Sequence, residues 1–347
     1  MRLLSAFVVL VWTFLVAPAS TGSGGLPLRT VATRSLPGGA SRFDYESLDE
    51  HRHVLFIAHL GASSIVVFNT RTRRMVTTIS GIVGVHGVLV VPRLHRLYAT
   101  ATDRNEVAVI NEDTLRVVAH VPTGTYPDGI AYDQREQTIV VSNETGATDT
   151  VISTRTNQRI ATIPLGGEAG NTQYDALSHR VLVDVQTLNQ LVAIDPATNR
   201  VVGRYGLPGC DHDHGLLLDT HAGLAFVACD GNAVLLVIDL RSMHVLQRAS
   251  VGADPDVLAL DTGLHRLYVA AESGIVTVFD EPGHRVRKIG RGFLASEAHV
   301  VAVESHSHEV YVPLGSVGGK PVLWIMMPTK AIRTCAGCGT YRSATFW

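Results

Sequence analysis

The chain has 347 residues and a formal net charge of −2 at pH 7. A single domain of this length is uncommon outside barrels and repeat architectures. Binding to a nucleic-acid backbone or an anionic membrane needs clustered Lys and Arg, and no long run of either charge occurs here. These observations exclude nucleic acid as the main partner and argue against a polybasic membrane patch.

The N-terminus predicts export. Arg2 precedes an apolar run over 3–16, and Ala17-Pro18-Ala19 supplies small residues of the kind a signal peptidase reads. We therefore expect a signal peptide over 1–19, a linker over 20–27, and a secreted or periplasmic protein. The alternative is an uncleaved N-terminal anchor. No other segment reaches the roughly 18 consecutive apolar residues of a membrane span, so no transmembrane domain is expected after cleavage.

A short apolar strand motif recurs seven times from Val54 onwards, at steps of 43, 42, 42, 43, 43 and 43 residues. It often follows a turn that contains His-Arg, as at His95-Arg96 and His265-Arg266. Such a constant period indicates a repeat architecture.

Each repeat holds four short strands separated by polar or glycine turns. In one repeat these include Leu191–Asp195 before a turn and Arg200–Val202 after it. Four β-rich strands in about 42 residues are typical of a propeller blade. We predict an all-β, seven-bladed β-propeller of four-stranded antiparallel blades over 28–327, which we expect to be a monomer.

The last blade needs a fourth strand. The segment 29–33 resembles the outer strands of other blades, and an N-terminal strand there would close the ring and remove open edges. The competing segment is 331–334. We favour the N-terminal strand because it otherwise has no partner for its backbone groups.

The repeat resembles the YVTN-type β-propellers, and more closely the exported bacterial YncE-like proteins. The residues that carry this resemblance are Leu267–Ala270, Tyr126–Ala131 and Leu191–Thr198. The resemblance implies a fold and leaves the function open, because propellers bind, scaffold or catalyse. It does not extend to the tail over 328–347, where Cys335 and Cys338 form a lone Cys-x-x-Cys, a weak metal or redox signal.

One repeat position is occupied mainly by Asp and His. Because the innermost strand of each blade lines the channel, equivalent positions form a ring, and six of the seven carry Asp or His. The seven positions are Asp44, His86, Asp128, Gly170, His214, Asp256 and His299. Gly170 contributes no side chain to the ring, so any site should lie away from blade four, unless the side chain of Glu168 reaches into that position.

Imidazole and carboxylate form the ligand set for divalent transition metals such as Zn, Fe, Mn or Cu. We expect His86, His214 and His299 as ligands, because the repeat does not require histidine there. Asp44, Asp128 and Asp256 would serve as catalytic bases, further ligands or partners that orient an imidazole. Asp128 and Asp256 also suit a purely local role in their turns.

Two further features flank the ring. The second strands return to the same face, and their ends form an outer rim made of His59, Thr102, Glu144, Gln186, Cys229, Glu272 and Gly315. Cys210 and Cys229 come out nearly opposite in one hairpin, which predicts a disulfide in an oxidising compartment, with free thiols or thiolate ligands as the alternative.

Eight other histidines fall in turns on the opposite face, and we expect them to be solvated. They are His51, His53, His95, His179, His221, His265, His306 and His308.

The leading functional hypothesis is a metal-dependent hydrolase or lyase acting on a small molecule. The alternative, at nearly equal weight, is a non-catalytic binding or scaffold module of the cell envelope, whose partner would be a small-molecule ligand or an envelope protein. A third hypothesis, an electron-transfer or quinoprotein partner, has less support.

Overall fold

The structure, a computed structural model, describes residues 25–329. The predicted signal peptide over 1–19 and Cys335 and Cys338 in the tail lie outside these residues. Among residues 25–329, no helix has the length and apolar character needed to cross a membrane.

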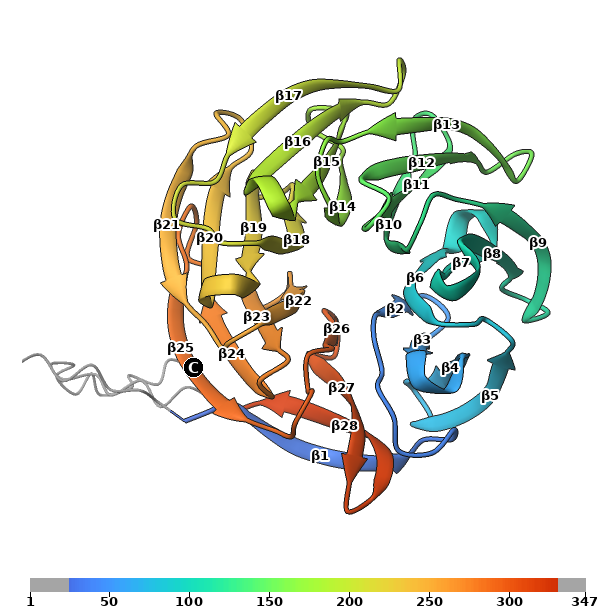
Figure 1. Cartoon of the computed structure of the whole chain (residues 1–347). Helices are drawn as coiled ribbons and strands as arrows, with labels where there is room; N and C mark the ends of the chain where they lie inside the picture. Colours follow the sequence, from blue (N-terminus) through green and yellow to red (C-terminus); the bar gives the residue numbers. More distant parts are fainter. Residues whose placement is uncertain (1–24, 330–347) are drawn as a thin grey trace, which may run out of the picture.

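The strands form seven four-stranded antiparallel sheets arranged as blades around one axis, which confirms the predicted fold (Figure 1). The innermost strands are β2 (Glu46–Asp49), β6 (Val85–Val91), β10 (Pro127–Asp133), β14 (Ala169–Asp175), β18 (Asp213–Asp219), β22 (Pro255–Asp261) and β26 (Ala302–Glu304). The second strands are β3 (Val54–His59), β7 (Arg96–Ala101), β11 (Thr138–Asn143), β15 (Arg180–Val185), β19 (Leu224–Cys229), β23 (Arg266–Ala271) and β27 (Glu309–Val317).

The third strands are β4 (Ser64–Asn69), β8 (Glu106–Asn111), β12 (Thr148–Ser153), β16 (Gln190–Asp195), β20 (Val234–Asp239), β24 (Ile275–Asp280) and β28 (Lys320–Pro328). The outermost strands are β5 (Arg74–Ser80), β9 (Arg116–Pro122), β13 (Gln158–Pro164), β17 (Arg200–Gly206), β21 (Val245–Ser250), β25 (Arg287–Phe293) and β1 (Leu28–Ser35). Short 3-10 turns follow five blade strands: η1 (Leu60–Ala62), η2 (Pro92–Leu94), η3 (Thr102–Arg104), η4 (Gln186–Leu188) and η5 (Asp230–Asn232).

Burial explains the composition of the strands. The second and third strands are almost continuously apolar and buried, as in Leu55–Ala58 and Ile65–Phe68, because neighbouring blades cover both of their faces. The outermost strands alternate between half-buried and exposed positions, as β17 does. The core is therefore a set of apolar layers between blades, and the inner strands contact one another around the axis.

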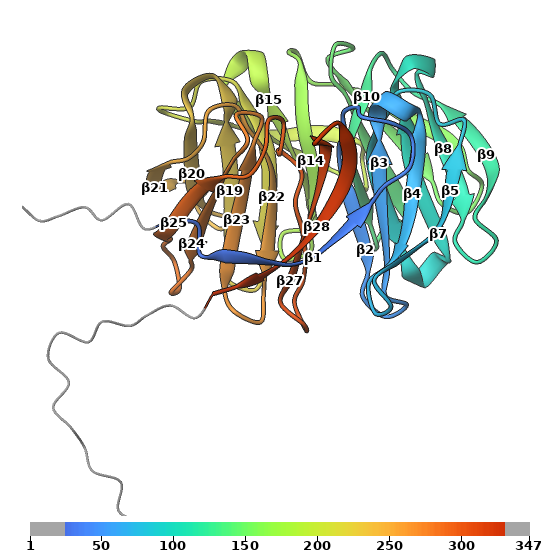
Figure 2. The ribbon, with the colours of Figure 1, turned by 90° about the horizontal axis from the view of Figure 1, so that it is seen from below.

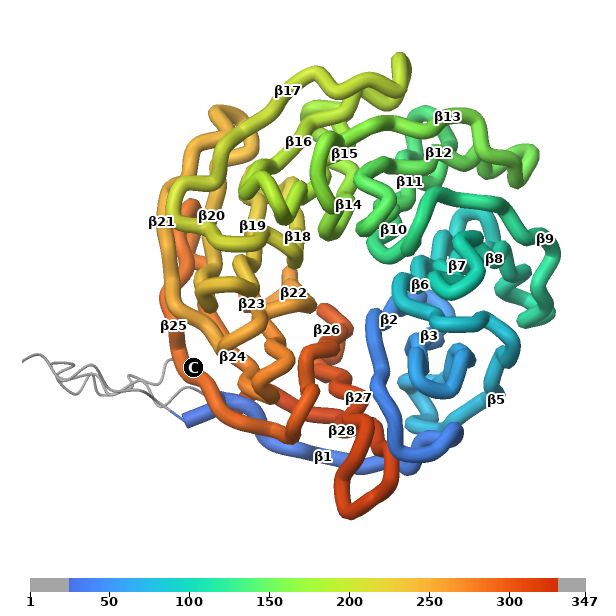
Figure 3. The backbone as a smooth tube through the Cα atoms, viewed as in Figure 1, coloured from blue at the N-terminus to red at the C-terminus, as the bar shows by residue number. Residues whose placement is uncertain are grey.

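The ring closes through the N-terminal strand, as predicted. β1 pairs antiparallel with β28, from Leu28 opposite Pro328 to Ser35 opposite Val322. Figures 2 and 3 show the two ends of the propeller meeting in this blade. The last sheet thus contains strands from both ends of the domain, and β28 presents no open edge to solvent.

Every outermost strand contains a β-bulge, which the repeat pattern did not predict. The extra residue is apolar in each blade: Val31, Val76, Val118, Ile160, Val202, Leu246 and Ile289. Most of these side chains are exposed. Bulges distort an edge strand and discourage pairing with another chain, so they protect seven exposed edges.

The turns between the first and second strands explain many of the histidines. His53, His95, His179, His265 and His308 have φ between 48° and 62°, the left-handed region that His tolerates better than most residues. Six of the eight predicted turn histidines are exposed. His308 Nδ1 is 2.9 Å from Asp261 Oδ2, which shows one such histidine paired with the aspartate that caps its neighbouring turn.

The buried side chain of Glu281 should make the stability of the protein depend on pH. Burial and the nearby carboxylate of Asp219 in the adjacent blade raise the pKa of Glu281 from 4.5 to about 7. Because the folded pKa is raised, the folded protein binds the extra proton, and this stabilisation is complete below about pH 4.5 and lost as pH rises towards 7. In urea unfolding, Glu281→Gln should be more stable than wild type at pH 8 by roughly 1–3 kcal/mol and equal to it near pH 4.

A matched control for this measurement is Glu136→Gln, which makes the same chemical change at a more exposed carboxylate. Glu136→Gln should leave the difference in the free energy of unfolding between pH 8 and pH 4 as it is in wild type. An equal gain in both variants at pH 8 would show that net charge, rather than the pair between blades, sets the effect.

Candidate functional site

Five of the seven ring residues occupy equivalent places because each lies in a β-bulge of an inner strand, whereas Asp44 and His299 lie just before β2 and β26. His86, Asp128, Gly170, His214 and Asp256 are the second residues of β6, β10, β14, β18 and β22. At each of them the pairing with the second strand shifts register; at His214, for example, Asp213 pairs with Cys229 and Gly215 pairs with Ala228. A bulge re-aims its side chain, so these residues can turn towards the axis instead of packing between blades.

Five of the six predicted residues line one cavity of about 320 Å³, which we call the mouth cavity. Its lining residues are Arg42, Asp44, His86, Tyr126, Asp128, Glu144, Gln186, His212, His214, Asp230, Asp254, Pro255, Asp256 and Glu272. The sixth, His299, reaches this site through Asp256, since His299 Nε2 lies 3.8 Å from Asp256 Oδ2. Glu144, Gln186 and Glu272 come from the predicted rim, whereas Glu168 does not line the cavity.

The three ring histidines share one anchoring scheme. The Nδ1 atoms of His86 and His299 lie 2.9 Å from the backbone carbonyls of Gly84 and Glu297. In His214 the same atom lies 2.9 Å from the side-chain carbonyl Oε1 of Gln186. A carbonyl oxygen only accepts hydrogen bonds, so Nδ1 carries the proton in all three rings.

This anchoring leaves Nε2 as the atom available for chemistry, as in metal-binding histidines. His214 Nε2 lies 3.4 Å from Asp256 Oδ1, and His86 Nε2 lies 3.3 Å from the hydroxyl of Tyr126. His299 is 1 % exposed, and its Nε2 is buried with no hydrogen-bond partner among the described residues. A buried nitrogen without a partner is costly and calls for a functional explanation.

The ring aspartates are buried, and their side-chain oxygens make few hydrogen bonds within the described residues. Asp128 Oδ1 has no hydrogen-bond partner among residues 25–329, and the contact of Asp256 Oδ1 is with His214 Nε2 at 3.4 Å. Neither of these oxygens therefore serves its own turn, which was the alternative considered for both residues. Asp128 Oδ1 remains available to a ligand or a proton.

Electrostatics divides the aspartates into two kinds. Burial and the charge of Asp128 raise the pKa of Asp44 to about 6, and burial raises that of Asp128 itself to about 7, partly offset by His214. Burial also acts on Asp256, but His214 and His299 outweigh it and lower the pKa of this carboxyl. Asp44 and Asp128 are thus suited to proton transfer near neutral pH, and Asp256 to a permanent charge.

Asp256 and His214 form a tight pair. Burial lowers the pKa of His214, yet the hydrogen bond and charge of Asp256 prevail and raise it to about 10. In the structure as it stands, His214 is therefore an imidazolium that balances Asp256.

One group of side chains has the spacing of a metal site. Asp256, Glu272 and His299 each offer a ligand atom, and these three atoms lie within 4.8 Å of one another. Neither His86 nor His214 belongs to such a group among the described residues. The group lies in blades six and seven, away from Gly170 in blade four.

Arg42 also belongs to the site, although no sequence motif predicted it. Arg42 Nη2 lies 2.8 Å from Glu272 Oε1, and its Nε lies 3.5 Å from Asp44 Oδ2. The signal that could have found Arg42 is its place in the repeat, two residues before the ring position of Asp44. His212 and Asp230 also line the cavity, with His212 Nδ1 2.8 Å from Asp230 Oδ1.

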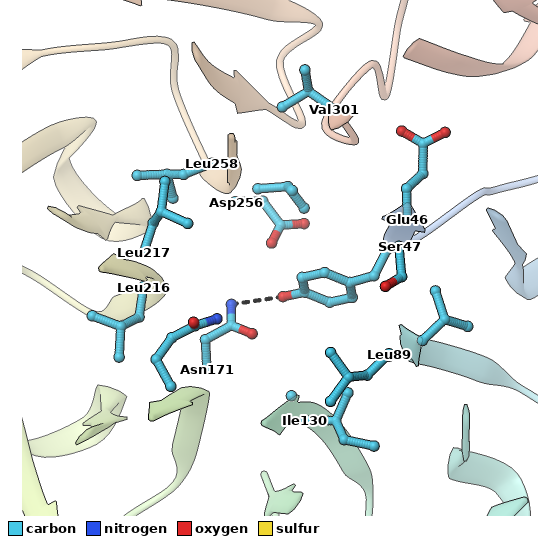
Figure 4. A pocket seen from close by; sticks show the side chains of 16 residues that line it. Glu46, Ser47, Leu89, Ile130, Asn171, Leu216, Leu217, Asp256, Leu258 and Val301 are labelled. Atoms are coloured by element: carbon cyan, nitrogen blue, oxygen red, sulfur yellow. Dashed lines mark hydrogen bonds between the residues drawn. The ribbon is translucent and has the colours of Figure 1, made fainter. Parts of the chain in front are cut away.

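A second cavity of about 170 Å³ lies deeper in the channel, and Asp256 lines both (Figure 4). Leu89, Ile130, Leu216, Leu258 and Val301 surround it. Asn171 Nδ2 donates a hydrogen bond of 2.7 Å to the hydroxyl of Tyr45, drawn as a dashed line in Figure 4. This contact joins blades one and four across the channel.

The predicted disulfide is present. Cys210 and Cys229 are bonded, with their Cα atoms 5.4 Å apart, which excludes free thiols and thiolate ligands in this structure. The bond links the segment just before β18 to the end of β19, beside the pair of His212 and Asp230.

Replacing both cysteines with serine should destabilise the propeller. The bond closes a loop with a sequence separation of 19 residues, for which about 3 kcal/mol is expected. The measurement is urea unfolding of the double variant against the oxidised wild type. Wild type treated with a reductant serves as the control and should match the variant; an unchanged midpoint in both would contradict a stabilising role.

The comparisons with known proteins concern the fold. No family model matches the chain. No curated protein sequence matches it either. Among solved structures, the chain is similar to Kuenenia stuttgartiensis hydrazine synthase, with a TM-score of 0.71 and 14 % sequence identity over 85 % of this chain and 97 % of that one. At this identity the likeness supports the propeller fold alone, and the resemblance to YVTN-type propellers stays a prediction.

Proposed function

We propose that the chain is an exported, YncE-like propeller that binds a divalent transition metal ion at the channel mouth and uses it on a small molecule. The main support for this proposal is the group formed by Asp256, Glu272 and His299, whose ligand atoms lie within 4.8 Å of one another. The unpartnered, buried Nε2 of His299 adds a second, independent indication. Nitrogen and carboxylate ligands suit Zn, Mn, Fe or Cu.

The surroundings support a cation. Within the part of the chain that the structure describes, the mouth cavity is lined by seven carboxylates and one Arg: Asp44, Asp128, Glu144, Asp230, Asp254, Asp256, Glu272 and Arg42. Three protein ligands would leave coordination positions open for water or substrate, as catalytic sites require. His214 and His86 remain candidates for further ligands or for contacts to the bound molecule.

The chemistry follows from this arrangement. A bound metal acts as a Lewis acid in hydrolysis or elimination, and Asp44 and Asp128 have pKa values of about 6 and about 7 that suit a general base. The cavity volume of about 320 Å³ fits a small molecule. The disulfide between Cys210 and Cys229 agrees with export to an oxidising compartment.

The experiment is metal analysis of protein purified without an affinity tag, followed by titration with Zn²⁺ and Mn²⁺. We expect one ion per chain in wild type and loss of most of the affinity in His299→Ala. His221→Ala, in an exposed turn, is the matched control and should bind as wild type does. The proposal fails if wild type binds no ion at the stoichiometry of one per chain.

A further inference from the structure

The positively charged guanidinium of Arg42 lies next to the place where the proposed metal would bind. Its guanidinium contacts Glu272 Oε1 at 2.8 Å and approaches Asp44 Oδ2 at 3.5 Å. Among residues 25–329, no Lys and no other Arg lines the mouth cavity. Besides the His214 imidazolium, which pairs with Asp256, Arg42 therefore supplies a positive charge in a cavity dominated by carboxylates.

Glu272 is shared by two competing partners. Its carboxylate belongs to the group with Asp256 and His299, and one of its oxygens is already engaged by Arg42. A metal ion on Glu272 would face the guanidinium at close range, where two positive charges repel. The ion pair and a metal-bound Glu272 are therefore alternative states of the same side chain.

We propose that Arg42 is a built-in counter-ion that competes with the metal and is displaced from Glu272 when the ion binds. This inference rests on the proposed metal site and adds a regulation of it. The Arg42 side chain is 34 % exposed, so the guanidinium has solvent into which it can move. Asp44, in contrast, is buried and stays in place.

The competition gives the site selectivity by charge. Displacing a guanidinium from a carboxylate gains little when the incoming ion also carries one charge. A divalent ion gains about twice the Coulomb energy at each carboxylate. The site should thus reject Na⁺ and K⁺ and accept Mn²⁺ or Zn²⁺ at a reduced affinity.

The test compares metal affinity in wild type, Arg42→Leu and Arg42→Lys by calorimetric titration with Mn²⁺ and with Zn²⁺. We expect Arg42→Leu to bind about tenfold more tightly or better, because the competing charge is gone. Arg42→Lys keeps the charge and should stay within about threefold of wild type. Arg93→Leu, in an exposed turn, is the matched control and should leave the affinity unchanged.

The outcomes separate this inference from the proposed function. Wild type and Arg42→Leu binding one ion with equal affinity would overturn the counter-ion and leave the metal site standing. Weaker binding by Arg42→Leu would overturn it as well. Binding by neither protein overturns both proposals, and binding by Arg42→Leu alone also overturns both, because the wild type would then hold no ion and Arg42 would not be displaced. Should Arg42→Leu unfold, Arg42→Gln makes the same comparison with a polar side chain.

Discussion

Asp256→Asn should lower the affinity for Zn²⁺ or Mn²⁺ by about a hundredfold or more, because it removes the carboxylate on which the site converges. Asp256 lies 3.4 Å from His214 Nε2 and 3.8 Å from His299 Nε2, and it belongs to the group with Glu272. Asn keeps the shape of the side chain but loses the charge. Competition with a chromophoric chelator measures the affinity of each variant.

Asp254→Asn is the matched control for this change. Asp254 lines the same cavity two residues earlier, but it is exposed, and Asn tolerates its φ of 52° as well as Asp does. Its affinity should stay within about threefold of wild type. An equal loss in both variants would mean that the cavity attracts cations through its overall charge and holds no specific site.

Removing β1 should abolish cooperative folding. The strand pairs with β28 over its whole length, and its absence would leave the backbone groups of β28 unpaired at an exposed edge. The loss should be on the order of 5 kcal/mol or more, which is comparable with the total stability of a typical domain. A variant lacking 28–35 should therefore show no cooperative urea transition and should associate in analytical ultracentrifugation.

A circular permutant distinguishes the strand itself from its position in the chain. Leu28 pairs with Pro328, and the backbone N–H of Thr329 donates to the carbonyl of Pro27 at 2.8 Å, so a short linker joins these ends as a hairpin. With new ends opened at Gly38–Gly39, this permutant should fold cooperatively. The account of closure would be wrong if the deletion variant stayed a monomer of wild-type stability.

The fold was predictable because the period of 42 or 43 residues and the apolar second strands repeat in every blade. The N-terminal strand was also predictable, since a backbone segment with strand character needs a partner. The bulges were not: residues such as Val118 and Ile160 look like ordinary strand residues, and only the register of the outermost strand reveals them.

The site was predictable in outline. The repeat register brought Asp44, His86, Asp128, His214 and Asp256 to the lining of one cavity. It could not say which side chains approach within ligand distance, because that depends on rotamers and on the local bulge. In the structure, Glu272 lies within ligand distance of Asp256 and His299. The repeat register predicted Glu272 only as part of the outer rim.

Arg42 illustrates the remaining limit of the sequence. It precedes its strand by a few residues, and its partners Asp44 and Glu272 lie in different blades. A contact between blades that involves a loop leaves no periodic signal. The same holds for the bond between Tyr45 and Asn171 across the channel.

The most direct test of the proposed metal site is an anomalous difference map from crystals grown with Zn²⁺ or Mn²⁺. We predict one strong peak at about 2.0–2.3 Å from His299 Nε2 and from carboxylate oxygens of Asp256 and Glu272, with Arg42 moved away from Glu272. A map without a peak in the mouth cavity, at metal concentrations that saturate binding in solution, would contradict the account.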